Sequence, residues 1–245
     1  MNDILKILRT EKEHHRKGGL YHQTQILFAY NSNRIEGSQL THEQTRYIYE
    51  TNTFLPSGNA VIRTDDIIET TNHFAAFDYM LDIADVPLTE KIIKNLHYLL
   101  KRGTSDERDP TFNVGEYKSL PNMIGEMVYT TSPAEVPVQI KKLLEEYQTK
   151  QTIKENDIID FHYRFERIHP FQDGNGRVGR LIMFKECLAH NLIPFVIDSE
   201  HKLFYYRGLR EYPTEPGFLT DTCLSAQDSY KHLISYFFNQ PTIDP

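Results

Sequence analysis

The sequence predicts a mostly α-helical protein. Apolar residues recur three and four positions apart through most segments, and the strict two-residue alternation of half-buried strands is scarce. The chain has 245 residues, of which 39% are hydrophobic and 12% aromatic, so it can bury a core of ordinary size. These observations favour a single helical unit with, at most, a short stretch of β-structure.

Helix starts and ends can be read from their capping residues. The first expected helix covers residues 24–35 and ends at Gly37, a common left-handed helix terminator. Thr41, with Gln44 three positions later, has the pattern of a capping box and starts the next helix, toward Tyr49. Further helices are expected over residues 65–83, 88–100, 133–149, 156–168, 177–191, 201–212 and 219–238. The helix over 177–191 is apolar on most sides, so we expect it to run through the core.

Residues 117–131 depart from the helical pattern. They combine Tyr, Val, Ile and Thr with a central Asn122 and Gly125, which predicts a short β-hairpin. The chain has no internal repeat and no linker long enough to separate domains. We therefore expect three regions of one unit: an N-terminal helical region over residues 1–60, a core domain over 61–212 and a C-terminal helical extension over 213–245.

Charge and hydropathy exclude several classes of partner. The formal net charge is -7 and no run of Lys and Arg is longer than two, so nucleic acid is not expected as a main ligand. No stretch approaches the roughly 18 apolar residues of a membrane span, and residues 1–20 lack the apolar region of a signal peptide. A cytoplasmic protein without membrane contact is expected. Cys187 and Cys223 form no CxxC pair, so neither a disulfide framework nor a thiolate zinc site is expected.

The segment from His169 to Arg180, HPFQDGNGRVGR, has the residue types of a phosphate site. Pro170 disfavours α geometry at the residue before it, so the preceding helix should end and leave His169 extended and free to move protons. Residues 173–176, Asp-Gly-Asn-Gly, tolerate positive φ, so successive N–H groups can form an anion-binding nest. A helix opening at Arg177 would add its positive dipole end.

Three charged side chains extend this pattern. Arg177 and Arg180, three positions apart, are expected to project toward the same anion. Asp173 offers a hard oxygen ligand of the kind that Mg²⁺ takes together with phosphates and water. A glycine-rich turn before a helix is common and alone is a weak indication of a phosphate site, and Phe171 is interpreted as a core anchor. The co-occurrence of base, carboxylate, nest, helix start and two arginines within twelve residues favours a functional site.

This segment fits the pattern HxFx(D/E)GNGRxxR, and the chain therefore resembles proteins with a Fic domain over about residues 65–209. The resemblance implies a Fic-type helical bundle with a small β-hairpin flap. It also implies a magnesium-dependent protein adenylyltransferase, which moves AMP from ATP to a Ser, Thr or Tyr hydroxyl of a target protein or of itself. By position, His169 would be the general base and Asp173 the magnesium ligand. The implied nucleotide-binding residues of the motif are Asp173, Gly174, Asn175, Gly176, Arg177 and Arg180.

A second match to this family lies upstream, in Ser32-Asn33-Arg34-Ile35-Glu36-Gly37. It is similar to the family's inhibitory motif (S/T)xxxE(G/N). The alternative is an ordinary helix end with an exposed Glu before a glycine cap. The position of the motif, N-terminal to the core, favours the regulatory interpretation. In that interpretation Ser32 and Glu36 are the inhibitory residues, and Glu36 pairs with Arg180 in the place of the γ-phosphate.

Other residues are assigned by the same resemblance. Residues 115–125 look like the flap that holds a target segment, which assigns target docking to Asn122, Met123, Ile124 and Gly125. Tyr205 and Tyr206 stand where similar proteins contact the nucleoside, although packing is an equal interpretation. His14, His15 and His22 are expected in solvent, and His162 is assigned no role.

Two other functions stay open at this point. Glu36 could position a water that removes AMP from a modified protein, which is the reverse reaction in the same family. The chain could also be a nucleotide-binding regulator without turnover, although a pure binder needs no base such as His169. The sequence leaves the target protein and the oligomeric state open, a homo-oligomer included.

Overall fold

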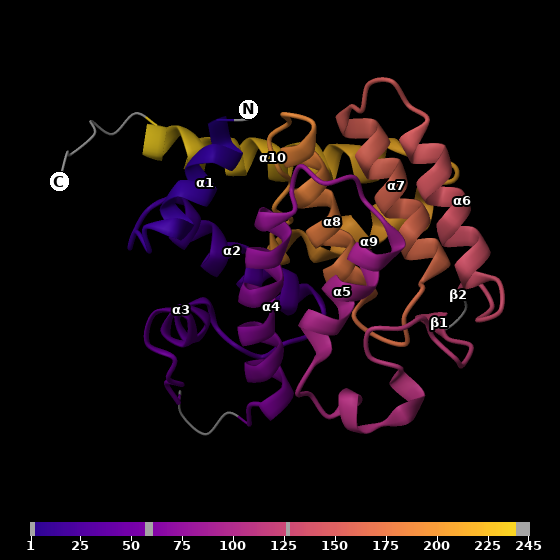
Figure 1. The fold of residues 1–245 in the computed structure, drawn as a ribbon, viewed down its shortest axis with the longest axis horizontal. Coiled ribbons are helices and arrows are strands. Elements are labelled where there is room, and N and C mark those ends of the chain that lie inside the picture. Colours follow the sequence, from indigo (N-terminus) through magenta and orange to yellow (C-terminus); the bar gives the residue numbers. More distant parts are fainter. Residues whose placement is uncertain (1–2, 57–60, 126–127, 239–245) are drawn as a thin grey trace.

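Helices dominate the computed structural model, which describes residues 3–56, 61–125 and 128–238 (Figure 1). The α-helices are α1 (Asp3–Glu13), α2 (Leu20–Ile35), α3 (His42–Thr51), α4 (Thr64–Asp82), α5 (Glu90–Lys101), α6 (Val136–Gln148), α7 (Glu155–Ile168), α8 (Asn175–Ala189), α9 (Lys202–Glu211) and α10 (Gly217–Phe238). Short 3₁₀ turns cover Asp106–Arg108, Pro110–Phe112 and Ser199–His201. The predicted mostly α fold is confirmed.

Helix α8 is the centre of the bundle. It packs against α2, α4, α5 and α7, and almost every residue from Asn175 to Leu188 is buried. The ring of Phe184 lies 5.2 Å from the rings of Phe28 and Phe77, which come from α2 and α4. The prediction that this helix runs through the core is correct, because its apolar residues surround the helix on most sides.

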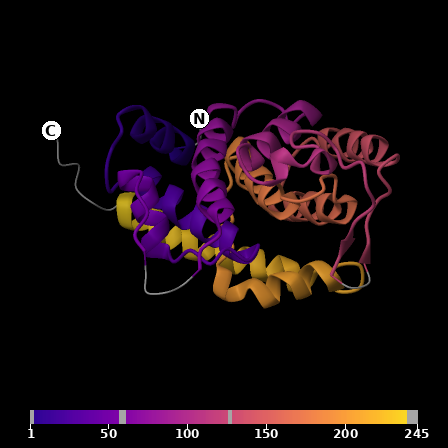
Figure 2. The same ribbon diagram turned by 90° about the horizontal axis from the view of Figure 1, so that it is seen from below.

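The remaining helices cover this centre. Helix α6 packs on the outer side of α7, and α1 lies against α2 and α4. Helices α9 and α10 form a closely packed pair that Figure 2 shows along one side of the molecule, with α10 also touching α2 and α7. Within the described residues, none of the helices combines the length and the hydropathy needed to cross a membrane. The division into three regions at residues 60 and 212 stays a prediction.

The N-terminal segment differs from the expectation. Helix α1 was not predicted, and α2 begins at Leu20 rather than at residue 24. Helix α1 is mostly charged and buries only a narrow face. Its buried Glu11 accepts a hydrogen bond of 2.8 Å from the N–H of Tyr21. The prediction that His22 lies in solvent is wrong. His22 is buried because α1, α3 and α4 pack around α2, and the Nε2 of His22 lies 2.9 Å from Oε1 of Glu50.

The hairpin is present and short. Strand β1 (Met123–Ile124) pairs antiparallel with β2 (Val128–Tyr129), in the register Met123 to Tyr129 and Ile124 to Val128. The rest of the predicted segment is loop and is tied down by side chains. Lys118 donates from Nζ to Asn122 Oδ1 at 2.7 Å and to Thr130 Oγ1 at 2.6 Å, which closes the base of the hairpin.

Candidate active site

His169 ends helix α7 in a left-handed conformation. Its φ is 52° and its ψ is 63°, and its N–H donates to the carbonyl of Phe165 at 2.9 Å. The expectation of an extended backbone is therefore wrong, although the helix does stop before Pro170. A left-handed residue at the end of a helix satisfies a carbonyl of the last turn, which an extended residue would leave open.

The loop after His169 is braced by a buried asparagine. Asn175 accepts at Oδ1 from the N–H of Phe171 at 2.8 Å and donates from Nδ2 to its carbonyl at 2.9 Å. Below it, His97 of α5 stacks on the Phe171 ring at 3.9 Å, and its Nε2 lies 3.1 Å from the Asp173 carbonyl. Sequence reasoning missed His97, which carried no signal beyond its place on an amphipathic helix. Both polar atoms of the Asn175 side chain bond the backbone of Phe171, and its backbone N–H lies in the first turn of α8, where it can be offered to a phosphate.

The N-terminus of α8 opens into a pocket of about 520 Å³. Gly174 precedes the helix with φ of 79°, and α8 starts at Asn175, two residues earlier than predicted. A helix N-terminus offers unpaired N–H groups and a positive dipole end to an anion. The pocket lining includes His169, Asp173, Gly174, Asn175, Gly176 and Arg180 from the motif, Glu36 from the end of α2, Ile124 and Gly125 from the hairpin, and Tyr205 and Tyr206 from α9.

Arg180 is buried and contacts the end of α2. Its Nη2 lies 2.6 Å from Glu36 Oε1 and 2.9 Å from the carbonyl of Ser32, and its Nε donates to Ser32 Oγ at 3.1 Å. Glu36 follows the last residue of α2, and Gly37 next to it has φ of 102°. Arg180 Nη1 is buried and, within the described part of the chain, has no hydrogen-bond partner. The regulatory meaning of these contacts stays a prediction.

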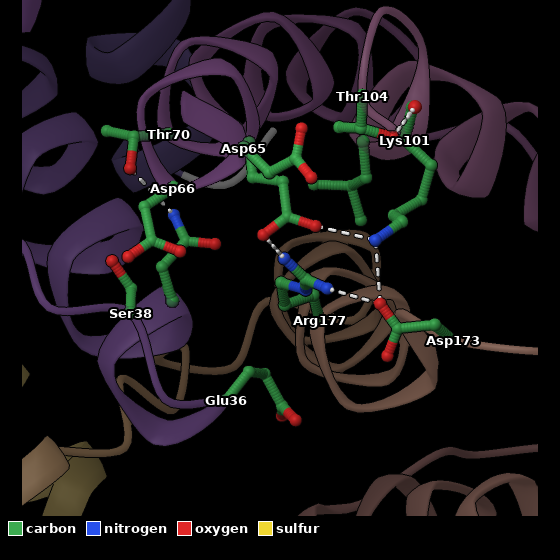
Figure 3. Close-up of polar contacts among 12 residues, drawn as sticks. Glu36, Ser38, Asp65, Asp66, Thr70, Lys101, Thr104, Asp173 and Arg177 are labelled. Carbon is green, nitrogen blue, oxygen red and sulfur yellow. Dashed lines mark hydrogen bonds and ion pairs between the residues drawn. The ribbon is translucent and has the colours of Figure 1, made fainter. Parts of the chain in front are cut away.

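Arg177 and Arg180 bond different partners: Arg177 pairs with Glu69 and Asp173, and Arg180 with Glu36 and Ser32. Figure 3 shows Arg177 directed toward Asp173, with Glu36 making no contact to it there. Its Nη1 lies 2.5 Å from Glu69 Oε2, and its Nη2 lies 3.1 Å from Asp173 Oδ2. Arg177 does not contribute to the pocket lining, so a direct phosphate contact by this residue stays a prediction. The cause is Glu69 of α4, a half-buried partner that the local sequence does not reveal.

Burial and charge set the protonation of the two candidate catalytic groups. Burial lowers the pKa of His169 to about 4, because the imidazolium loses hydration there. Its Nδ1 lies 3.3 Å from the carbonyl of Glu166, which can only accept, so Nε2 is left as the proton acceptor. Burial opposes ionisation of Asp173, but Arg177 and Lys101 outweigh it and hold the pKa of Asp173 well below its usual range. Near pH 7 the histidine is neutral and the aspartate is charged.

The two tyrosines of α9 differ in exposure. Tyr205 is buried, and its hydroxyl lies 2.6 Å from Nε2 of His162, which is buried as well. Tyr206 is 38% exposed and donates its hydroxyl to the carbonyl of Ile35 at 3.0 Å. Tyr205 thus packs the floor of the pocket, and Tyr206 ties α9 to the end of α2. Contact with a nucleoside stays a prediction for both.

The hairpin meets the motif through Asn122. Its Nδ2 donates to the carbonyl of Phe171 at 3.0 Å, so this side chain is directed inward. Met123 and Tyr129 are 52% and 79% exposed, and Ile124 and Gly125 line the pocket. Target docking by these residues stays a prediction.

Comparison with known proteins agrees with this arrangement. Residues 87–187 match the model of the Fic/DOC family. Two curated relatives are the "Protein adenylyltransferase Fic" of Nematostella vectensis, 27% identical over 189 residues, and the "Protein adenylyltransferase fic-1" of Caenorhabditis elegans, 24% identical over 192 residues. The matches cover 74% and 76% of this chain but only 42% and 36% of those proteins. The chain thus spans less than half the length of these relatives.

Solved structures share the fold. A Fic domain containing signaling protein from Bacteroides thetaiotaomicron superposes with a TM-score of 0.72 and 27% identity, covering 95% of this chain and 91% of that one. A fragment of Fic-1 from C. elegans gives a TM-score of 0.71 at 21% identity, covering 96% and 71%. The family-model match, the relatives and the shared fold agree: residues 87–187 match the Fic/DOC family, and the chain as a whole has the fold of Fic proteins.

Proposed function

We propose that the protein transfers AMP from ATP to a hydroxyl group of a target protein. The observation that carries the proposal is a neutral base and an anion-binding helix end in one pocket, namely His169 and the N-terminus of α8. The two relatives named protein adenylyltransferases support the same activity. A site that only bound nucleotide would need the helix end but not the base.

The proposed reaction uses His169 as the general base. The target hydroxyl gives its proton to Nε2 and its oxygen forms a bond to the α-phosphorus of ATP, while the bond from that phosphorus to the bridging oxygen breaks and pyrophosphate leaves. The N–H groups of the first turn of α8 and the Arg180 guanidinium would hold the phosphates. Placing the reactants in this way supplies much of the rate enhancement in phosphoryl transfer.

A magnesium ion fits the residues at the pocket edge. The Asp173 side chain is 48% exposed, lines the pocket and is held in its charged form, which is the donor chemistry that this ion prefers. Asp173 would supply one carboxylate ligand. When bound, the ion would offset negative charge on the phosphates.

In this proposal Glu36 restrains the reaction. Its carboxylate lies in the same pocket and takes Nη2 of Arg180 at 2.6 Å, a donor that a terminal phosphate would otherwise use. ATP would then bind with its phosphates displaced and the α-phosphorus poorly aligned with the attacking hydroxyl. Removal of Glu36 should therefore raise transfer more than it raises ATP affinity.

The position of Glu36 also favours a second candidate function, removal of AMP from a modified protein. A carboxylate inside the pocket that also contains His169 is placed to orient a water molecule for attack on phosphorus. The two functions give opposite signs for one variant, because Glu36→Gly should increase AMP transfer but abolish AMP removal.

The test uses ATP labelled at either the α- or the γ-phosphate. Wild type and Glu36→Gly are incubated with each label and a cell extract, and separately with an AMP-modified protein. Label retained on protein from α-labelled ATP alone supports transfer of AMP, and mass spectrometry of the labelled band identifies the target. Label from the γ-phosphate that exceeds the labelling of the extract alone, on the band that α-labelled ATP also marks, would contradict the proposal. Loss of AMP from the modified protein with wild type only would favour the second function.

A further inference from the structure

Lys101, at the end of α5, occupies the centre of a cluster of carboxylates. Its side chain is 3% exposed, and its Nζ lies 2.6 Å from Glu69 Oε1 and 2.6 Å from Asp173 Oδ2, with Asp106 as a third contact. Figure 3 shows the Lys101 ammonium and the Arg177 guanidinium both reaching the same oxygen of the Asp173 carboxylate. An ammonium group has three donors, so each of its N–H bonds can be used by one acid.

The oxygens around Lys101 have the spacing of a cation site. One carboxylate oxygen each from Glu69, Asp106 and Asp173 lies within 4.8 Å of the others. The distance of 2.6 Å from Nζ to Glu69 and to Asp173 equals the upper end of the usual range between Ca²⁺ and oxygen. The Lys101 ammonium thus occupies the position in which a divalent cation could bind the carboxylates of Glu69, Asp106 and Asp173.

The cluster also determines which oxygen of Asp173 is available. Lys101 and Arg177 both contact Asp173 through Oδ2, at 2.6 Å and 3.1 Å. The Asp173 carboxylate also lines the pocket proposed for the nucleotide. Its contacts with Lys101 and Arg177 restrict its rotation, so a ligand in the pocket contacts a carboxylate of fixed orientation. Three carboxylates face two cations, which leaves one negative charge for the whole cluster.

We infer that Lys101 is a positioning residue: its ammonium takes the place of a free divalent cation among Glu69, Asp106 and Asp173, and holds Asp173 for a metal that enters with the nucleotide. This inference rests on the proposed function for the role of Asp173. It predicts that the wild-type cluster does not take up Mg²⁺ or Ca²⁺ alone, because the cation position is filled.

The first experiment measures metal binding without nucleotide. Melting temperatures of wild type, Lys101→Met and Lys185→Met are compared in EDTA, Mg²⁺ and Ca²⁺. Lys185 is a matched control, since it is equally buried but pairs with a single carboxylate, Glu186, at 2.8 Å. We expect a metal-dependent rise for Lys101→Met only. No rise for Lys101→Met, or an equal rise for wild type, would overturn the inference. If Lys101→Met folds only when metal is present, that rescue supports it.

A second variant separates orientation from charge. In Lys101→Met/Asp106→Asn two carboxylates face Arg177, so the cluster keeps its single negative charge and folding is not opposed by extra repulsion. Loss of a group that orients a metal ligand typically costs about 10- to 100-fold in metal affinity. We therefore expect calorimetric ATP binding to need about 10-fold more Mg²⁺ than in wild type, whose cluster carries the same charge. An unchanged Mg²⁺ requirement would contradict the positioning role.

Failure of the proposed function would look different. If Glu36→Gly transfers no AMP, the adenylyltransferase proposal fails, but the melting and calorimetric comparisons still test Lys101. If transfer occurs and Lys101→Met shows neither metal-dependent effect, only the inference about Lys101 fails.

Discussion

The carboxylate of Glu36 rests against Gly176 in the first turn of α8. A β-carbon at Gly176 would lie 2.2 Å from Glu36 Oε1 and 2.9 Å from Arg180 Nη1. The absence of a side chain at Gly176 therefore leaves the space in which Glu36 reaches Arg180. The two motifs are more than 130 residues apart in the sequence. In the fold, Glu36 of the first motif fits against Gly176 of the second and pairs with its Arg180.

Gly176→Ala should displace Glu36 from Arg180. The contact is a charge-assisted hydrogen bond, so its loss should lower the free energy of unfolding by about 1–3 kcal/mol. In a Glu36→Gly background the same substitution should cost less, because only the contact of the β-carbon with Arg180 Nη1 remains and alanine is the better helix former by about 1 kcal/mol. Urea unfolding of the four proteins measures this difference. An equal loss in both backgrounds would contradict the contact.

Tyr206→Phe should partly release the end of α2. It removes the hydroxyl that donates to the Ile35 carbonyl, a hydrogen bond with a typical net value of about 1 kcal/mol. We expect pyrophosphate release to rise about 5-fold, which corresponds to that energy. The rise should vanish in a Glu36→Gly background, and Tyr236→Phe, which changes an exposed tyrosine of α10, should have no effect. A rise of the same size without Glu36 would show that the hydroxyl acts elsewhere.

His169→Ala should remove transfer and keep nucleotide binding. Loss of a general base typically costs about 10²- to 10⁴-fold in rate, whereas the helix end, Asp173 and Arg180 remain. Turnover is measured in the Glu36→Gly background and ATP affinity by calorimetry. His232→Ala, an exposed histidine of α10, serves as the control. Turnover within a few fold of the parent would refute the assignment of His169.

The pH dependence of transfer should reflect the lowered pKa of His169. Because burial lowers that pKa to about 4, the neutral imidazole persists well below the usual value of about 6.5. For Glu36→Gly we expect kcat/KM to stay constant from pH 7 down to about pH 5 and to fall below it, as the base becomes protonated. Removing the negative charge of Glu36 can only lower this pKa further, since Glu36 raises it. A fall centred near pH 6.5 would contradict the buried environment of His169.

The motif could be predicted from the sequence because its parts are contiguous. The helix start near Arg177, the turn at Gly174 and the helix end at His169 all follow from local preferences of Gly, Asn and Pro. The left-handed conformation of His169 was missed, since it depends on a hydrogen bond to Phe165 that competes with the extended form.

The partners of the motif could not be predicted, because they come from distant helices. Glu69 of α4 and Lys101 of α5 are separated from Arg177 and Asp173 by more than 70 residues, and helical periodicity tells which face is buried but not which charged residue stands on it. His97 was missed for the same reason. Arg180 and Glu36 were linked only by resemblance to a family pattern, which the composition of either segment would not reveal.

In the proposed function His169 is the general base of AMP transfer and Glu36 restrains that transfer. The most direct measurement is the intact mass of purified wild type, Glu36→Gly and Glu36→Gly/His169→Ala after incubation with ATP and Mg²⁺, with pyrophosphate release followed in parallel. We expect Glu36→Gly to gain the mass of AMP and to release pyrophosphate, wild type to do so far more slowly, and the double variant to do neither. If Glu36→Gly acquires AMP no faster than wild type, Glu36 is an ordinary helix end, and if the double variant acquires it equally fast, His169 is not the base.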